Sequence, residues 1–219
     1  YCNLLYNEKI NLEEDVIGYD KYIEWQYNYI NTDMKFDREY FKGLYGNGKV
    51  TMLPNTKKEE LGIPRKAEKI TVKKEQIYID NIDIIAQKLN VSRFSIILAA
   101  YSRFVSWLTN EDIITIATIV NGRSNSKFKN TIGPFSAPFP LKLYASKGID
   151  KEELIEQCNN EIIEINSRSY YPVSDLINII PEYRQLPIET YFSDIGINYT
   201  NYKPKNEKKQ NDSYRVIEI

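Results

Sequence analysis

The sequence predicts an α/β protein in which helices cover a mixed β-sheet. Two apolar runs, residues 112–120 and 139–144, have the length and composition of neighbouring strands. Segments with helical periodicity stand before and after these runs along the chain. Because an amphipathic helix must bury its apolar face, we expect the helices to pack as a layer on the sheet.

Two helices are expected in the first part of the chain. The first covers residues 19–30, and its periodicity places five side chains on one face: Tyr19, Tyr22, Ile23, Gln26 and Ile30. Asp33 can cap a second helix, which ends at the glycine-rich residues 46–48.

An irregular segment follows and divides the chain. Residues 50–66 combine prolines, a glycine and mixed charges, which indicates a surface crossing between two structural units. We therefore expect one unit over residues 1–66 and a second over residues 67–219. Residues 69–73 then alternate in the manner of an edge strand.

Two more helices are predicted before the central strands. The first covers residues 80–89 and turns Ile82, Ile85, Ala86 and Leu89 inward. The second covers residues 94–108, with Ser92 as its N-cap. Its broad apolar stripe predicts a core helix against a sheet, and consists of Phe94, Ile97, Leu98, Tyr101, Phe104, Val105 and Leu108.

The stretch 113–143 joins the two predicted strands through a polar, glycine-bearing connection. The first strand is almost continuously apolar, as expected of a strand buried on both faces. Loops at the ends of rigid strands often carry function, which draws attention to Arg123. Its guanidinium could hold a carboxylate or a phosphate, or it could act as a structural latch on nearby carbonyls.

The remaining elements complete the predicted order. Asp150 opens a helix over residues 152–166, which buries Leu154, Ile155, Cys158, Ile162 and Ile165. A short helix over residues 173–180 and strands over 194–200 and 214–219 follow. Because the chain opens without methionine and ends in a strand-like segment, we expect it to be a piece of a longer polypeptide.

The composition argues against several classes of function. The chain has no histidine, which excludes a histidine general base, Ser-His or Cys-His pairs and most zinc sites. The carboxylates Asp20 and Glu24 stand one turn apart, but no third ligand accompanies them and no metal site is expected. A net charge of −1 argues against nucleic acid or a membrane surface as partner. With only two cysteines, a reduced, cytoplasmic protein is expected.

Several motifs, taken in order, resemble those of the condensation domain of nonribosomal peptide synthetases. Residues 19–26 (Y-D-K-Y-I-E-W-Q) resemble that family's Y-x-D-Y-A-x-W-Q, and residues 119–123 (I-V-N-G-R) resemble V-S-G-R. Residues 132–142 (I-G-P-F-S-A-P-F-P-L-K) resemble I-G-x-F-V-N-T-L-P-L-R. Residues 167–177 (S-R-S-Y-Y-P-V-S-D-L-I) are a diverged form of H-Q-D-Y-P-F-E-x-L-I. The resemblance covers nearly the whole chain.

The resemblance implies a lobe like that of chloramphenicol acetyltransferase and a reaction that forms amide bonds. A donor thioester and an acceptor amine would both be carried on phosphopantetheine arms, so peptidyl carrier proteins and neighbouring synthetase domains are the expected partners. No cofactor is expected to bind the chain directly. Residues 1–66 would cover the end of the first lobe and the crossing, and residues 67–219 an incomplete second lobe.

The resemblance also implies which residues matter. The family's catalytic H-H-x-x-x-D-G is absent, so no catalytic residue is expected and the chain alone should be inactive. Five residues are expected to shape or support the substrate tunnel: Asn121, Arg123, Gly133, Phe135 and Ser136.

Two departures from the family pattern leave alternatives open. Residues 136–138 (S-A-P) replace Val-Asn-Thr, and the motif at 167–177 lacks the leading His-Gln. The chain could therefore be a fragment of a related epimerisation or cyclisation domain. It could also be a non-catalytic module that docks carrier proteins.

Overall fold

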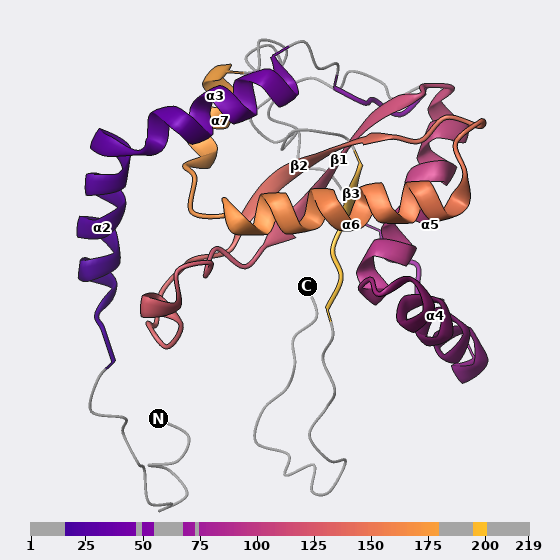
Figure 1. Cartoon of the computed structure of the whole chain (residues 1–219), viewed down its shortest axis with the longest axis horizontal. Coiled ribbons are helices and arrows are strands. Elements are labelled where there is room, and N and C mark those ends of the chain that lie inside the picture. The colour runs from indigo at the N-terminus through magenta and orange to yellow at the C-terminus, as the bar shows by residue number, and fades with distance from the viewer. Residues whose placement is uncertain (1–15, 47–49, 55–67, 73–74, 180–194, 201–219) are drawn as a thin grey trace, which may run out of the picture.

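The protein folds into a small mixed sheet with helices packed around it, as predicted (Figure 1). The structure is a computed structural model that describes residues 16–46, 50–54, 68–72, 75–179 and 195–200. Its elements, in chain order, are α2 (Tyr19–Thr32), α3 (Met34–Tyr45), α4 (Gln76–Leu89), α5 (Arg93–Thr109), β1 (Ile113–Val120), η1 (Ser126–Phe128), β2 (Ala137–Tyr144), α6 (Lys151–Ser167), α7 (Val173–Ile179) and β3 (Gly196–Ile197). The strand predicted at 214–219 lies outside the described residues.

The sheet has the strand order β2-β1-β3. β1 and β2 are antiparallel, with Ile113 opposite Tyr144 and Val120 opposite Ala137. β3 is parallel to β1 and covers two residues of the strand predicted at 194–200. A Cβ atom on Gly196 would lie 3.4 Å from the carbonyl oxygen of Ala117, at ordinary contact distance.

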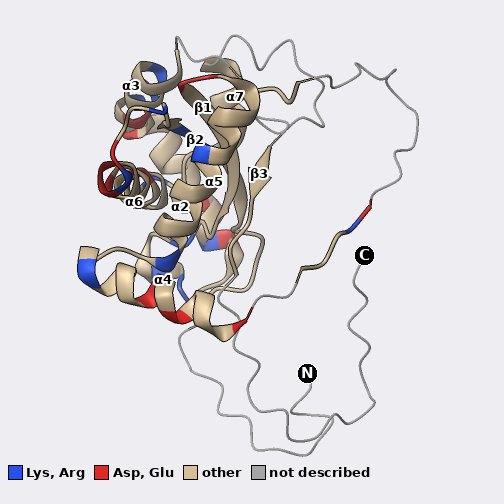
Figure 2. Cartoon of the chain, turned by 90° about the vertical axis from the view of Figure 1, so that its right-hand side faces the viewer, with Lys and Arg blue, Asp and Glu red and all other residues tan. Residues whose placement is uncertain are grey.

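The helices enclose the main core beside the two long strands. α5 and α6 pack against each other and against the strands, and α6 lies across them in Figure 1. α3 and α7 contact each other, and Phe41 of α3 packs on Phe139 of β2 and on Tyr171. In the view of Figure 2, acidic and basic residues share the same helices, α4 included. None of the described helices is long and apolar enough to cross a membrane.

The outer edge of β2 has its backbone groups covered. Lys142 donates its backbone N–H to Glu161 Oε1 at 3.5 Å, and Tyr144 donates its own to Gln157 Oε1 at 2.6 Å. The two earlier residues of β2 whose backbone N–H would face this edge are Pro138 and Pro140, and proline has no N–H to donate. An edge strand without free donors cannot recruit another strand, so α6 and the two prolines end the sheet on this side.

The buried face of α5 follows the predicted stripe in part: Leu98 and Val105 are buried as predicted. Phe104 and Leu108 are 50% and 37% exposed, whereas small residues are buried in their place: Ser95, Ala99, Ser102 and Ser106. The reason is the close packing of α5 on α6, where Ser95 donates a hydrogen bond to Asn159 at 3.0 Å. The predicted N-cap is confirmed, because Ser92 Oγ accepts the N–H of Ser95.

Two other helices also follow their predicted inward faces only in part. In α2, aromatic residues at Tyr22, Trp25 and Tyr29 turn inward, while Ile23 and Ile30 are exposed. Tyr22 and Trp25 pack on the rings of the β1–β2 connection, whereas Tyr29 packs edge-on against Tyr170. α4 begins four residues before its predicted start and buries no residue fully. Of the residues predicted to face inward, Ile82, Ala86 and Leu89 are half-buried and Ile85 is exposed.

Two predictions about extended segments and one about a helix cap need correction. Residues 68–72 form no strand, and Ile70 is 90% exposed, because no described strand lies beside this segment. β1 is buried on both faces only in part: Thr115 is buried and Ala117 half-buried, but Ile113 and Ile119 on the same face are each about half exposed. Asp33 stands at the predicted N-cap of α3, but its side chain makes no capping hydrogen bond. The predicted α6, by contrast, is confirmed, with its N-cap at Asp150 accepting the N–H of Glu152.

Candidate functional site

Arg123 acts as a latch inside the β1–β2 connection, residues 121–136. Its Nη1 donates to the carbonyl oxygens of Phe128 at 2.9 Å and Thr131 at 2.7 Å, with a longer contact to Lys129 at 3.3 Å. The guanidinium also lies 3.9 Å from the centre of the Phe135 ring. All these acceptors are neutral, so the structure supports the latch rather than a carboxylate or phosphate site.

Two glycines in the connection lie where an added Cβ atom would collide with a neighbouring group. Gly122 has φ of 71°, and a Cβ there would lie 1.9 Å from the carbonyl oxygen of Phe135. A Cβ on Gly133 would lie 2.2 Å from the ring of Tyr19, whose hydroxyl donates to the carbonyl of Pro134 at 3.0 Å. The motif that begins at Tyr19 and the motif that contains Gly133 are therefore in direct contact.

An aromatic cluster completes this contact. The rings of Tyr22 and Phe135 have their centres 4.6 Å apart, and Phe128 meets Tyr22 edge-on at 5.2 Å. These three residues form a small buried core that is separate from the main one. Thr131 adds a polar tie, because its hydroxyl donates to the carbonyl of Ile17 at 2.8 Å. The connection is thus fixed against α2 by rings and hydrogen bonds together.

The five residues predicted for the tunnel do not form one group. Arg123, Gly133 and Phe135 lie together against α2, as described above. Asn121 instead lines a separate cavity of about 180 Å³ between β1 and the helices α5 and α6. Ser136 is exposed just before β2.

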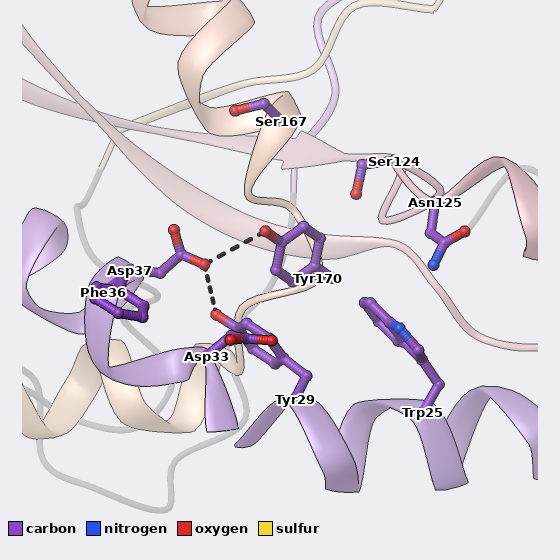
Figure 3. Close-up of a pocket in the computed structure, with 9 residues that line it drawn as sticks. All are labelled: Trp25, Tyr29, Asp33, Phe36, Asp37, Ser124, Asn125, Ser167 and Tyr170. Carbon is purple, nitrogen blue, oxygen red and sulfur yellow. Dashed lines mark hydrogen bonds between the residues drawn. The ribbon is translucent and has the colours of Figure 1, made fainter. Parts of the chain in front are cut away.

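A larger cavity of about 490 Å³ opens beside this connection (Figure 3). Its walls come from α2, α3, the β1–β2 connection and the segment that follows α6. The lining residues are Trp25, Tyr29, Asp33, Phe36, Asp37, Ser124, Asn125, Ser167 and Tyr170. The cavity therefore brings together both parts of the chain that the sequence predicted to be separate units.

Asp37 organises one wall of this cavity. Its Oδ2 accepts hydrogen bonds from the hydroxyls of Tyr29 at 2.7 Å and Tyr170 at 3.3 Å (Figure 3). Arg168 Nε lies 3.2 Å from Asp37 Oδ1, but away from the direction of its N–H, so this is a charge contact rather than a hydrogen bond. Burial raises the pKa of both tyrosines, and the neighbouring Asp37 carboxylate raises each further, so both hydroxyls stay protonated donors.

Sequence reasoning did not identify this wall. Tyr170 and Trp25 lie in quoted motifs, but their pattern gave no sign of a shared cavity. The sequence pattern did not distinguish Asp37 from a surface residue, because a carboxylate on an amphipathic helix is normally solvated. Asp37 could have been found by asking which carboxylate accepts hydrogen bonds from the tyrosines, since buried tyrosine hydroxyls need acceptors.

The described residues offer no activated nucleophile or metal site. Cys158 is fully buried, and burial raises the pKa of its thiol to about 12, which makes it unreactive at neutral pH. Within the part of the chain that the structure describes, no group of three or more Cys, Asp or Glu is placed to hold a metal ion. The arrangement can bind and position a ligand, but the described side chains supply no evident chemistry of their own.

Comparison with known proteins identifies related chains. A family model described as "Condensation domain" matches residues 1–217. Surfactin synthase subunit 1 of Bacillus subtilis (strain 168) is 24% identical over 168 residues, which cover 76% of this chain and 5% of that protein.

Solved structures share the fold at low sequence identity. The first condensation domain of the calcium-dependent antibiotic synthetase, in complex with a substrate analogue, matches with a TM-score of 0.65 and 16% identity. That match covers 90% of this chain and 41% of the solved chain. A four-domain nonribosomal peptide synthetase bound to AMP and glycine matches with a TM-score of 0.59 and 14% identity, over 80% of this chain and 13% of that one. The chain thus spans less than half of each of these relatives.

Proposed function

This chain belongs to the condensation-domain family, whose members have the chloramphenicol-acetyltransferase-like fold, and we propose that it is part of a domain that forms amide bonds in nonribosomal peptide synthesis. The observation that carries this proposal is the family match over residues 1–217. The contact between the Tyr19 and Gly133 motifs supports it, because two family-like segments far apart in sequence form one cluster.

The proposed substrates are a donor thioester and an acceptor amine, each carried on the phosphopantetheine arm of a carrier protein. Carrier proteins and neighbouring synthetase domains are therefore the proposed partners. The short share of surfactin synthase subunit 1 that this chain spans, 5%, fits a unit within a multidomain protein. A cytoplasmic location is part of the same proposal, and the unpaired thiol of Cys158 suits a reducing compartment.

We propose that the chain alone does not catalyse the reaction. Attack of an amine on a thioester needs a group that accepts a proton near neutral pH, and histidine usually fills this role. The chain has no histidine, and Cys158 is buried as a neutral thiol. The catalytic H-H-x-x-x-D-G would then come from polypeptide outside this chain.

The role proposed for this chain is to support the substrate tunnel. Arg123, Gly133 and Phe135 would hold the β1–β2 connection in place, while the exposed Asn121 and Ser136 would be free to face the tunnel. We also propose that residues 1–66 end one lobe and residues 67–219 begin the next. The cluster between α2 and the connection would then join the two lobes.

The test compares the 219-residue chain with a longer polypeptide that includes the residues encoded upstream. Each would be mixed with carrier proteins loaded with aminoacyl groups, and amide products would be measured by mass spectrometry. We expect product from the longer polypeptide and none from the chain alone. Turnover by the chain above a no-protein control would overturn its proposed inactivity. Carrier-protein binding by the longer polypeptide without any product would favour the docking-module alternative.

A further inference from the structure

The cavity beside Asp37 has three packed aromatic rings in its walls. The rings of Trp25 and Tyr29 are stacked with centres 6.0 Å apart on α2. Tyr170 packs edge-on against both, at 4.9 Å from Tyr29 and 5.5 Å from Trp25. Phe36, which is 67% exposed, adds a fourth ring to the lining, although Lys35 Nζ already lies over this ring, 5.0 Å from its centre. Aromatic rings arranged around a cavity favour cations, because their faces carry negative charge density.

The charges in the lining have one sign. Asp33 and Asp37 both line the cavity, and no lysine or arginine does. Asp37 is engaged by the hydroxyls of Tyr29 and Tyr170 and by the nearby Arg168. Asp37 is therefore part of the wall, and a ligand would have to displace these contacts to pair with it.

Asp33 differs, because no cation neutralises it. Among the described residues its carboxylate accepts only the hydroxyl of Thr32, at 3.2 Å, and forms no ion pair. Behind the wall, the charge of Arg168 is shared between Asp37 and Glu164. The side chains around the cavity therefore keep an excess of negative charge.

We propose that this cavity binds a small organic ammonium ion, with the aromatic rings around its body and the Asp33 carboxylate as its counter-ion. A metal ion fits less well, because metals such as calcium need several oxygen ligands together and the described residues offer no such group. A neutral ligand would leave the charge of Asp33 unused. The proposal does not depend on the proposed amide-forming function, since binding is measured without carrier proteins.

The test uses two probes of equal size that differ in charge, 2-phenylethylammonium chloride and 2-phenylethanol. Each is titrated into the full 219-residue chain by isothermal titration calorimetry. We expect the ammonium ion to bind about tenfold more tightly than the alcohol, since only the cation gains the attraction of the rings and the carboxylate. Equal affinities, or no detectable heat with either probe, would overturn the proposal.

Asp33→Asn tests the counter-ion directly. The substitution removes the charge and keeps the shape, and the side chain makes no helix-capping bond that folding would need. We expect the affinity for the ammonium ion to fall roughly three- to fivefold and the affinity for the alcohol to stay the same. Glu39→Gln makes the same charge change on α3 outside this cavity, and should leave both affinities unchanged. An equal loss in the two variants, or no loss in Asp33→Asn, would show that Asp33 is not the counter-ion.

Discussion

The two connections that flank β2 are held by the same kind of contact but anchor different parts of the molecule. Residues 121–136 lead into β2, and Arg123, which lies within the segment, donates to three of its carbonyls. Residues 145–150 lead out of β2, and Arg103 of α5 donates to the carbonyls of Ala145, Ser146 and Ile149. In each, one guanidinium organises a loop by satisfying several backbone acceptors.

The difference lies in what each loop contacts next. The loop after β2 is tied to α5, a helix of the main core, and it closes that core. The loop before β2 is tied to α2 through its own aromatic cluster, and it borders the 490 Å³ cavity. A loop fixed to the core mainly contributes stability, whereas a loop fixed to a second element can position a binding surface.

The largest expected effect comes from comparing one glycine substitution in each of the two loops. Gly133→Ala places a Cβ 2.2 Å from the Tyr19 ring, so the ring or the loop must move. Gly148→Ala in the second loop meets nothing within 4 Å. We expect Gly133→Ala to lower the free energy of unfolding by about 2–3 kcal/mol and Gly148→Ala to change it by less than about 0.5 kcal/mol. Urea denaturation measures both, and equal effects would contradict the difference drawn between the loops.

Replacing each arginine by methionine tests the shared contact. Methionine keeps the apolar stem but leaves the carbonyls without their donor, which costs about 2 kcal/mol at Arg103, where the contacts are partly buried. At Arg123 we expect a similar loss of stability, so ligand binding is needed as a second measurement to distinguish the two variants. Arg123→Met should also weaken 2-phenylethylammonium binding, because the loop borders the cavity, while Arg103→Met should not. Isothermal titration calorimetry measures the affinity of both variants. Equal losses of affinity in the two variants would contradict the different roles of the two loops.

A smaller, pH-dependent effect is expected at the edge of β2. Burial raises the pKa of Glu161 to about 7, while its hydrogen bond from the Lys142 N–H acts in the opposite direction. A carboxyl group with a raised pKa binds its proton more tightly in the folded state, so folding loses stability as pH rises from about 4.5 to about 7. Glu161→Gln should therefore be more stable than the parent protein by about 1 kcal/mol at high pH, after allowance for solvent screening.

The measurement is denaturation at pH 5 and pH 8. The stability difference between Glu161→Gln and the parent should be larger at pH 8 than at pH 5. Glu156→Gln, on the exposed side of the same helix, is the matched control and should show no such change. If both variants follow the pH dependence of the parent, Glu161 is ionised in the folded protein at pH 5.

The smallest effect concerns the cavity wall. Tyr170→Phe removes the longer of the two hydroxyl contacts to Asp37, at 3.3 Å, while Tyr29 keeps the shorter one. We expect a loss of about 0.5 kcal/mol in urea denaturation, because Asp37 retains its other partners. Tyr29→Phe should cost more, and the reverse order would mean that Tyr170 is the main anchor of this carboxylate.

The sequence predicted local structure well because local structure depends on nearby residues. The N-cap at Ser92, the helix opened by Asp150 and the paired runs at β1 and β2 all follow from spacing and residue type over a few positions. The family resemblance extended this to the fold, since the order of motifs carries information that no single motif has.

Only the tertiary structure decided which faces and residues meet. A Cβ atom at Gly133 would collide with the ring of Tyr19, and no pattern near position 133 encodes that contact. The buried stripe of α5 adds small residues to Leu98 and Val105 because α6 approaches closely, although larger apolar residues were available. Asp37 became part of a cavity wall because tyrosines from α2 and from position 170 turned toward it. Hydrophobic periodicity determines which segments fold as helices or strands, but the partners of each side chain depend on contacts that span the whole chain.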